Sequence, residues 1–122
     1  MNLVVVEDSP AMLRLLLAML ARVQGLHVVG TAGSEREAIA LIARTRPDVV
    51  LLDLFLTPGH GLEVLRAIRA AGHTCQALVL TSETVHHEYR RVGERLGVVS
   101  FHDKGDGLRR LMHDLERAVA AA

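Results

Sequence analysis

The stretch Pro47-Asp48-Val49-Val50-Leu51-Leu52-Asp53-Leu54 places an uninterrupted apolar run between two aspartates. A short run of this kind is typical of a strand that is buried on both of its faces. Such strands occur in parallel sheets whose two faces are covered by helices. The stretch therefore predicts a central parallel strand at Val49–Leu52, with Asp53 directly at its carboxyl end.

Similar apolar blocks and helix-like periods extend from this strand in both directions. The other predicted strands are Leu3–Val6, Leu26–Thr31, Ala77–Leu80 and Val98–Phe101. Between them, apolar residues recur at helical spacing, and five alternating strand–helix units predict an α/β fold with right-handed crossovers. The expected helical stripes are Leu13, Leu16, Leu17 and Leu20; Ile39 and Ile42; Leu62, Leu65 and Ile68; Val85, Tyr89, Val92 and Leu96; and Leu108, Leu111, Met112, Leu115 and Val119.

Local signals mark where these helices begin and end. Ser9-Pro10 is a cap and first-turn pair for the first helix, which we expect to run to Gly25. Ser34 and Glu37 form a capping box for the second helix. We expect Asp106 to cap the fifth helix. Pro47 and Gly72 are expected to end the second and third helices.

Composition limits the classes of function. With 122 residues the chain suits one domain, residues 1–122. Its 14 basic residues balance 14 acidic ones, so we expect no direct DNA binding. The single cysteine, Cys75, fits a reducing compartment, and charges interrupt every apolar run. We therefore expect a cytoplasmic protein with no membrane contact.

Polar residues follow the predicted strands. Glu7-Asp8, Asp53 and Thr81 come at strand ends, and Lys104 lies in the loop after the last strand. Because ligands bind beyond the carboxyl ends of parallel strands, we expect these side chains to converge. Three carboxylates in one place require a cation, and an all-oxygen site suits Mg²⁺.

The same residue set suits phosphoryl transfer. Asp53 is the candidate nucleophile, which would become an aspartyl phosphate. Thr81 and Lys104 would each contact a phosphoryl oxygen and so assist catalysis. The expected ligands of Mg²⁺ are Glu7, Asp8, Asp53 and the carbonyl group of Phe55.

These motifs together resemble the receiver domains of two-component response regulators, the family of the bacterial chemotaxis regulator. The resemblance covers essentially the whole chain and depends on four stretches in order. They are Val4–Ser9, Pro47–Leu54 followed by Gly61–Leu65, Leu78–Ser82, and Phe101–Lys104.

The resemblance implies a flavodoxin-like (βα)5 fold with strand order 2-1-3-4-5. It also implies that Asp53 takes phosphate from a sensor histidine kinase or a histidine phosphotransfer protein. Such a domain catalyses its own phosphorylation and dephosphorylation and is not otherwise an enzyme. Thr81 and Phe101 would form its switch, and the fourth helix, fifth strand and fifth helix would signal to an unknown downstream protein.

Three positions depart from the family pattern. Gly105 follows Lys104 where relatives usually carry a cis-proline, so we expect a trans peptide bond there. Pro58 lies one position later than usual, which predicts an altered loop before the third helix. Phe55 is bulky and apolar where many relatives carry a polar residue.

Other interpretations compete with this one. Asp8 alone could be a helix cap, and Phe101 alone a core residue. A phosphatase of the haloacid dehalogenase type would also use an aspartate nucleophile, but its motif needs a second aspartate at the position of Phe55. A receiver-like module that takes no phosphate is a third possibility, which the complete acidic set, Thr81 and Lys104 disfavour.

Overall fold

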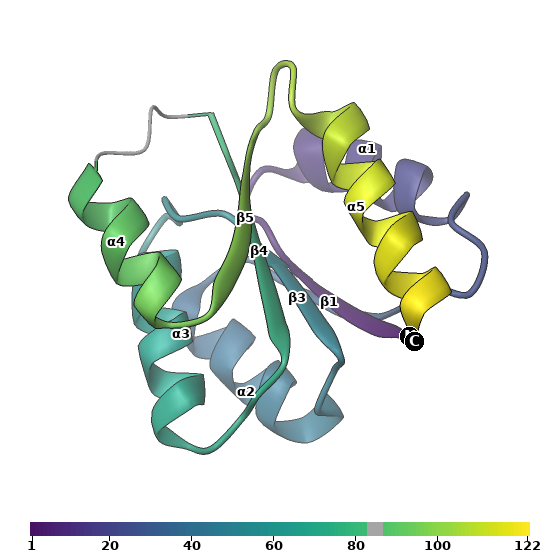
Figure 1. Cartoon of the computed structure of the whole chain (residues 1–122). Coiled ribbons are helices and arrows are strands. Elements are labelled where there is room, and N and C mark those ends of the chain that lie inside the picture. The colour runs from purple at the N-terminus through teal and green to yellow at the C-terminus, as the bar shows by residue number, and fades with distance from the viewer. Residues whose placement is uncertain (83–86) are drawn as a thin grey trace.

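The computed structural model describes residues 1–82 and 87–122. Strands and helices alternate along the chain (Figure 1). Their bounds are β1 Asn2–Val6, α1 Pro10–Leu20, β2 His27–Ala32, α2 Glu35–Thr45, β3 Val49–Leu52, α3 Gly61–Ala70, β4 Gln76–Thr81, α4 His87–Arg95, β5 Val98–Asp103 and α5 Leu108–Ala121. Within the described part of the chain, no helix has the length and apolar character needed to cross a membrane.

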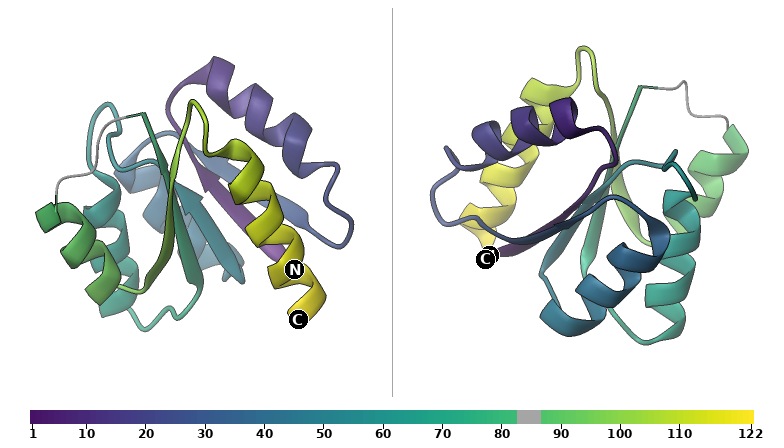
Figure 2. Two further views of the ribbon diagram at one scale, coloured as in Figure 1. Left: turned by 45° about the horizontal axis from the view of Figure 1, so that its top comes forward. Right: turned by 180° about the vertical axis from the view of Figure 1, so that it is seen from behind.

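The five strands form one parallel sheet in the order β2-β1-β3-β4-β5. This order confirms the predicted flavodoxin-like fold. Helices α1 and α5 cover one face of the sheet, and α2, α3 and α4 cover the other (Figure 2). The buried strand predicted at Val49–Leu52 is β3, and it lies in the middle of the sheet.

Alternate residues of β3 enter the two halves of the core. Val50 and Leu52 belong to the cluster that includes α2 and α3 residues, whereas Val49 and Leu51 belong to the cluster that includes α1 and α5 residues. Side chains of a strand point alternately to the two faces of a sheet, so a strand covered on both sides needs apolar residues throughout. This requirement explains the unbroken apolar run in the sequence.

Several predicted boundaries differ from the structure. Strand β2 lies one residue later than predicted, β4 is one residue longer at each end, and β5 extends to Asp103. Helix α1 ends at Leu20 rather than running to Gly25. After Leu20 the chain forms a turn, in which the Val23 amide donates to the Leu20 carbonyl three residues earlier at 3.0 Å. Val85, predicted to be part of the fourth apolar stripe, lies outside the described residues.

The predicted caps of α1 and α2 are confirmed, and the predicted cap of α5 is wrong. The Ser9 hydroxyl accepts from the Met12 amide, and the Ser34 hydroxyl accepts from the Glu37 amide. At α5 the cap residue is Gly107, which makes no side-chain capping bond, not Asp106. A Cβ on Gly107 would lie 2.6 Å from the Asp103 carbonyl oxygen, so close packing against the end of β5 selects glycine.

Arg69 of α3 ties three segments together at the amino-terminal end of the sheet. Its Nε donates to the Leu96 carbonyl at 2.7 Å, and one of its terminal nitrogens donates to the His73 carbonyl at 2.9 Å. These acceptors lie in the α4–β5 and α3–β4 connections. A charged donor shared by two backbone carbonyls contributes more than an exposed ion pair does.

We therefore expect Arg69→Met to lower the free energy of unfolding by about 2 kcal/mol, since both carbonyls lose a charged donor. Arg66→Met is the matched control on the same helix. Among the described residues Arg66 forms its ion pair with Glu63, and both side chains are about half exposed. Its loss should cost below about 0.5 kcal/mol. Urea unfolding of both variants measures the difference, and equal midpoints would contradict the role assigned to Arg69.

Candidate functional site

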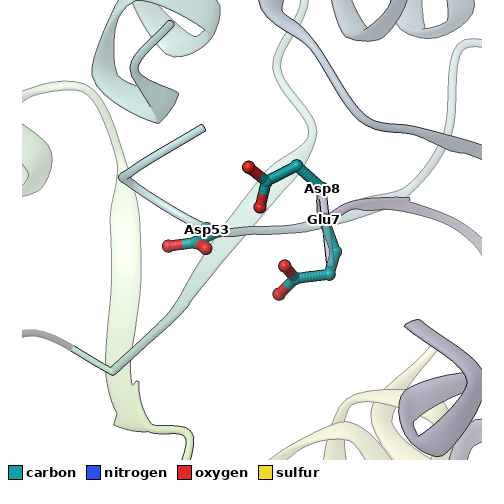
Figure 3. Close-up of side chains that lie close together, drawn as sticks. All are labelled: Glu7, Asp8 and Asp53. Atoms are coloured by element: carbon teal, nitrogen blue, oxygen red, sulfur yellow. The ribbon is translucent and has the colours of Figure 1, made fainter. Parts of the chain in front are cut away.

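Three carboxylates gather at the carboxyl ends of β1 and β3. Strand pairing sets Val6 beside Leu52, so the residues that follow them, Glu7 and Asp53, come out of the sheet next to each other. Glu7, Asp8 and Asp53 each offer an oxygen atom within 4.8 Å of the other two (Figure 3). Glu7 and Asp53 are only 3% and 5% exposed, so water solvates their charges poorly.

Lys104 supplies a positive charge to this cluster. Its Nζ lies 2.7 Å from Glu7 Oε1 and 2.8 Å from Asp53 Oδ2. It is the only lysine in the sequence, and the compact ammonium group can contact two carboxylates at once. One positive charge faces three negative ones, so the cluster retains an excess of negative charge.

The environment of Lys104 favours its charged form. Burial lowers the pKa of Lys104, but the hydrogen bonds and charges of Asp53 and Glu7 outweigh burial and hold the pKa above its usual value. A lysine with a raised pKa stabilises the fold below its unfolded pKa, and the contribution is lost only as the pH rises through the folded pKa. Lys104 therefore keeps its positive charge across the neutral range.

Backbone amides fix the remaining carboxylate oxygens. The Ser9 amide donates to Glu7 Oε2 at 3.0 Å, and the Phe55 amide donates to Asp53 Oδ1 at 3.1 Å. Both carboxylates are thus held on one side by the backbone and on the other by Lys104. Asp8 is less buried than these two residues and has more freedom to meet a ligand from solution.

The loop between β3 and α3 is closed tightly beside Asp53. The Gly61 amide donates to the Leu54 carbonyl at 2.6 Å, and a Cβ on Gly61 would collide with the Asp53 carbonyl oxygen. Phe55 and His60 form an isolated antiparallel bridge across this loop. The altered position of Pro58 accompanies a cis Thr57–Pro58 peptide bond.

His60 is the N-cap residue of α3, and its ring lies beside two aromatic rings. Its Nδ1 accepts from the Leu62 amide at 3.1 Å. Burial lowers the pKa of His60, although the charges of Glu63, Glu35 and Asp53 act in the opposite direction. The ring lies 5.2 Å from the rings of both Phe55 and Tyr89, measured between centroids.

Thr81 and Phe101 lie on the neighbouring strands. Thr81, at the end of β4, is buried, and its carbonyl accepts from the Lys104 amide at 3.1 Å. Phe101 of β5 is half buried beneath α4, with the Arg90 guanidinium carbon 4.5 Å from its ring centroid. A Cβ on Gly93 would come within 2.9 Å of this ring, so the glycine makes room for it.

The structure brings the three acids, Thr81 and Lys104 to one edge of the sheet, whereas the Phe101 ring packs against α4. The expected trans bond between Lys104 and Gly105 is present, and Lys104 still points at Asp53 without the usual proline. The alternative interpretation of Asp8 as a helix cap is wrong, because Ser9 caps α1. Sequence reasoning missed the cation–π contact of Arg90, since nothing in its spacing distinguishes it from Arg91.

Comparison with known proteins identifies the family. The chain matches the family described as Response regulator receiver domain over residues 3–116, and it belongs to that family. It is a receiver domain of the two-component type, a class of domain that interacts with histidine kinases.

Individual relatives are longer than this chain. The DNA-binding transcriptional activator DevR/DosR of Mycobacterium tuberculosis is 39% identical over 79 residues, which are 65% of this chain and 36% of that protein. Protein-glutamate methylesterase/protein-glutamine glutaminase 5 of Myxococcus xanthus is 31% identical over 107 residues, 88% of this chain and 31% of that protein. The chain thus spans about a third of the length of these curated relatives.

A solved structure agrees with the fold. The LuxR-family two-component response regulator from Aurantimonas sp. SI85-9A1 is similar with a TM-score of 0.87 and 25% sequence identity. The similarity covers 98% of this chain and 85% of that one.

The charge balance of the site predicts that Lys104→Met destabilises the metal-free protein. Without Lys104, two nearly buried carboxylates face each other unpaired, at a cost of about 3 kcal/mol. Lys104→Arg keeps the charge and should lose less. Denaturant unfolding in EDTA measures both variants. If Lys104→Met unfolds at the same denaturant concentration as the wild type, the ion pairs with Glu7 and Asp53 do not hold the site together.

Proposed function

We propose that this receiver domain accepts a phosphoryl group on Asp53 and signals by changing its protein-binding surface. The observation that carries the proposal is the position of Asp53, between the Glu7-Asp8 pair and the ammonium group of Lys104. A carboxylate in that position is oriented by Lys104 and by the Phe55 amide. The donor would be the phosphohistidine of a sensor histidine kinase or of a histidine phosphotransfer protein.

The excess negative charge of the cluster supports a bound Mg²⁺. Glu7, Asp8 and Asp53 offer only oxygen ligands, which this ion prefers. We propose Asp8 and Asp53 as direct ligands, with Glu7 acting directly or through water and the Phe55 carbonyl completing the set. The ion would supply neutralisation of charge on the transferring phosphoryl group.

The residues of the chain would then act in defined roles. An Asp53 oxygen attacks phosphorus, the bond from phosphorus to the donor nitrogen breaks, and the electron pair leaves with the donor imidazole. Lys104 gives up part of its contact with the carboxylates to pair with a phosphoryl oxygen, and the Thr81 hydroxyl donates to another. Hydrolysis of the aspartyl phosphate would use the same groups, so the domain would assist its own dephosphorylation.

The proposed output surface consists of α4, β5 and α5. Thr81 ends β4, the strand beside β5. Phe101 belongs to β5, and its ring packs against α4. Movement of Thr81 toward a phosphoryl group would leave space behind it that the Phe101 ring can enter. Such a contact differs between the two states and can therefore bias them.

We propose one receiver domain at residues 1–122, acting in the cytoplasm through protein contacts. The balance of 14 basic and 14 acidic residues gives no electrostatic support for DNA binding by this stretch itself. The activities named for the relatives belong to longer proteins, of which this chain matches about a third.

Treatment with acetyl phosphate and Mg²⁺ should add the mass of a single phosphoryl group to the wild type and none to Asp53→Asn. Intact-mass spectrometry measures this directly, and Asp106→Asn is a control that removes an exposed acid outside the cluster. An unchanged phosphate mass in Asp53→Asn would assign the acceptor elsewhere.

Magnesium affinity should depend unequally on the two acids after β1. We expect Asp8→Asn to weaken binding by about tenfold or more. Asp8 is the least buried of the three carboxylates and the most free to bind an ion from solution. Glu7→Gln should weaken it less, since the Glu7 oxygens already contact Lys104 and the Ser9 amide. Isothermal titration with Mg²⁺ compares the variants, and wild-type affinity in both would refute the proposed metal site.

A further inference from the structure

All three aromatic residues of the chain converge on α4. The sequence contains two phenylalanines, one tyrosine and no tryptophan. Tyr89 belongs to α4, Phe101 packs beneath it at Gly93, and Phe55 reaches it from the loop after β3. The Phe55 and Tyr89 ring centroids are 6.0 Å apart at an interplanar angle of 72°, an edge-to-face arrangement.

Helix α4 has few other attachments in the part of the chain that the structure describes. Gly93 is its only buried residue there, and Tyr89 and Val92 are half buried. The other helices each bury at least two residues, most of them large aliphatic side chains. An element with few buried contacts lies at the low-stability end of a fold, where small changes shift its position.

Phe55 joins this helix to the phosphoacceptor candidate. Its amide donates to Asp53 Oδ1 while its ring contacts Tyr89, so one residue contacts both the carboxylate and α4. Phosphorylation of either oxygen removes the formal charge of the carboxylate and weakens the bond from this amide, because charge-assisted bonds are the stronger ones. The link therefore differs between the two states, as a switch requires.

His60 adds a cost to the packing of the Phe55 and Tyr89 rings. Because its Nδ1 accepts from the Leu62 amide, the neutral ring carries its proton on Nε2. This Nε2 is buried and has no hydrogen-bond partner among the described residues. A buried donor without a partner opposes the packed arrangement that the ring contacts favour, and separation of the rings would return it to water.

We propose that the Phe55–Tyr89 contact is a second link, beside Thr81 and Phe101, through which the state of Asp53 sets the position of α4. This inference rests on the proposed function of Asp53. It assigns α4 two inputs, one from the β3–α3 loop and one from β5. Tyr89 is a positioning residue in this scheme and takes no part in phosphoryl transfer.

Amide hydrogen exchange tests the link. Exchange is measured in peptides covering His87–Arg95 and Val98–Asp103. The protein is compared with and without Mg²⁺ and beryllofluoride, which mimics a phosphoryl group. We expect Tyr89→Leu to reduce the beryllofluoride-dependent difference in α4 by about threefold, as loss of one aromatic pair allows, and to retain the difference in β5. Tyr89→Phe keeps the ring and should retain most of the difference in α4.

Val92→Ala is the control for loss of packing alone, since it truncates another half-buried residue of α4 outside the ring group. The inference is overturned if Tyr89→Leu keeps the full α4 difference, or if Val92→Ala loses as much of it. It also fails if the wild type takes phosphate on Asp53 and α4 does not respond. Absence of phosphate uptake at Asp53 would instead overturn the proposed function, and the second link with it.

Discussion

The charged site at the sheet edge depends on the ion pairs that Lys104 makes with Glu7 and Asp53. Both carboxylates are nearly buried, and like charges so close together would repel strongly without a counter-charge. Lys104 offsets only part of this repulsion. The remaining negative charge favours a further cation, and this partial compensation underlies the proposed magnesium dependence.

The parallel sheet creates this arrangement. Because all five strands run the same way, their carboxyl ends meet at one edge, and residues distant in the sequence become neighbours there. The aliphatic core holds the strands in register, so the charged groups gain their positions from apolar packing elsewhere. Helix α4 is the exception, since aromatic contacts attach it to the loop beside Asp53 and to β5.

Much of the fold could be predicted from the sequence, because apolar patterning and Ser caps act locally. The run Val49–Leu52 gave the central strand with its observed bounds. The capping of α5 could not be predicted, since Gly107 is selected by its approach to the Asp103 backbone, a tertiary contact. The contact between Phe55 and Tyr89 beside His60 could not be predicted either. The two residues are distant in sequence, and helical periodicity marks Tyr89 only as a core residue. The convergence of the acids followed from topology, whereas the double pairing of Lys104 required its side-chain geometry.

The most direct test of the central claim is the fluorine NMR spectrum of the protein with beryllofluoride as Mg²⁺ is added. In the proposed site, a phosphoryl mimic on Asp53 would need the carboxylate, the metal and Lys104 together. We expect bound fluorine resonances to appear in the wild type only when Mg²⁺ is present, and to be absent from Asp53→Asn throughout. Lack of a bound resonance in folded wild-type protein at saturating Mg²⁺, or its persistence in Asp53→Asn, would contradict a phosphoacceptor at Asp53.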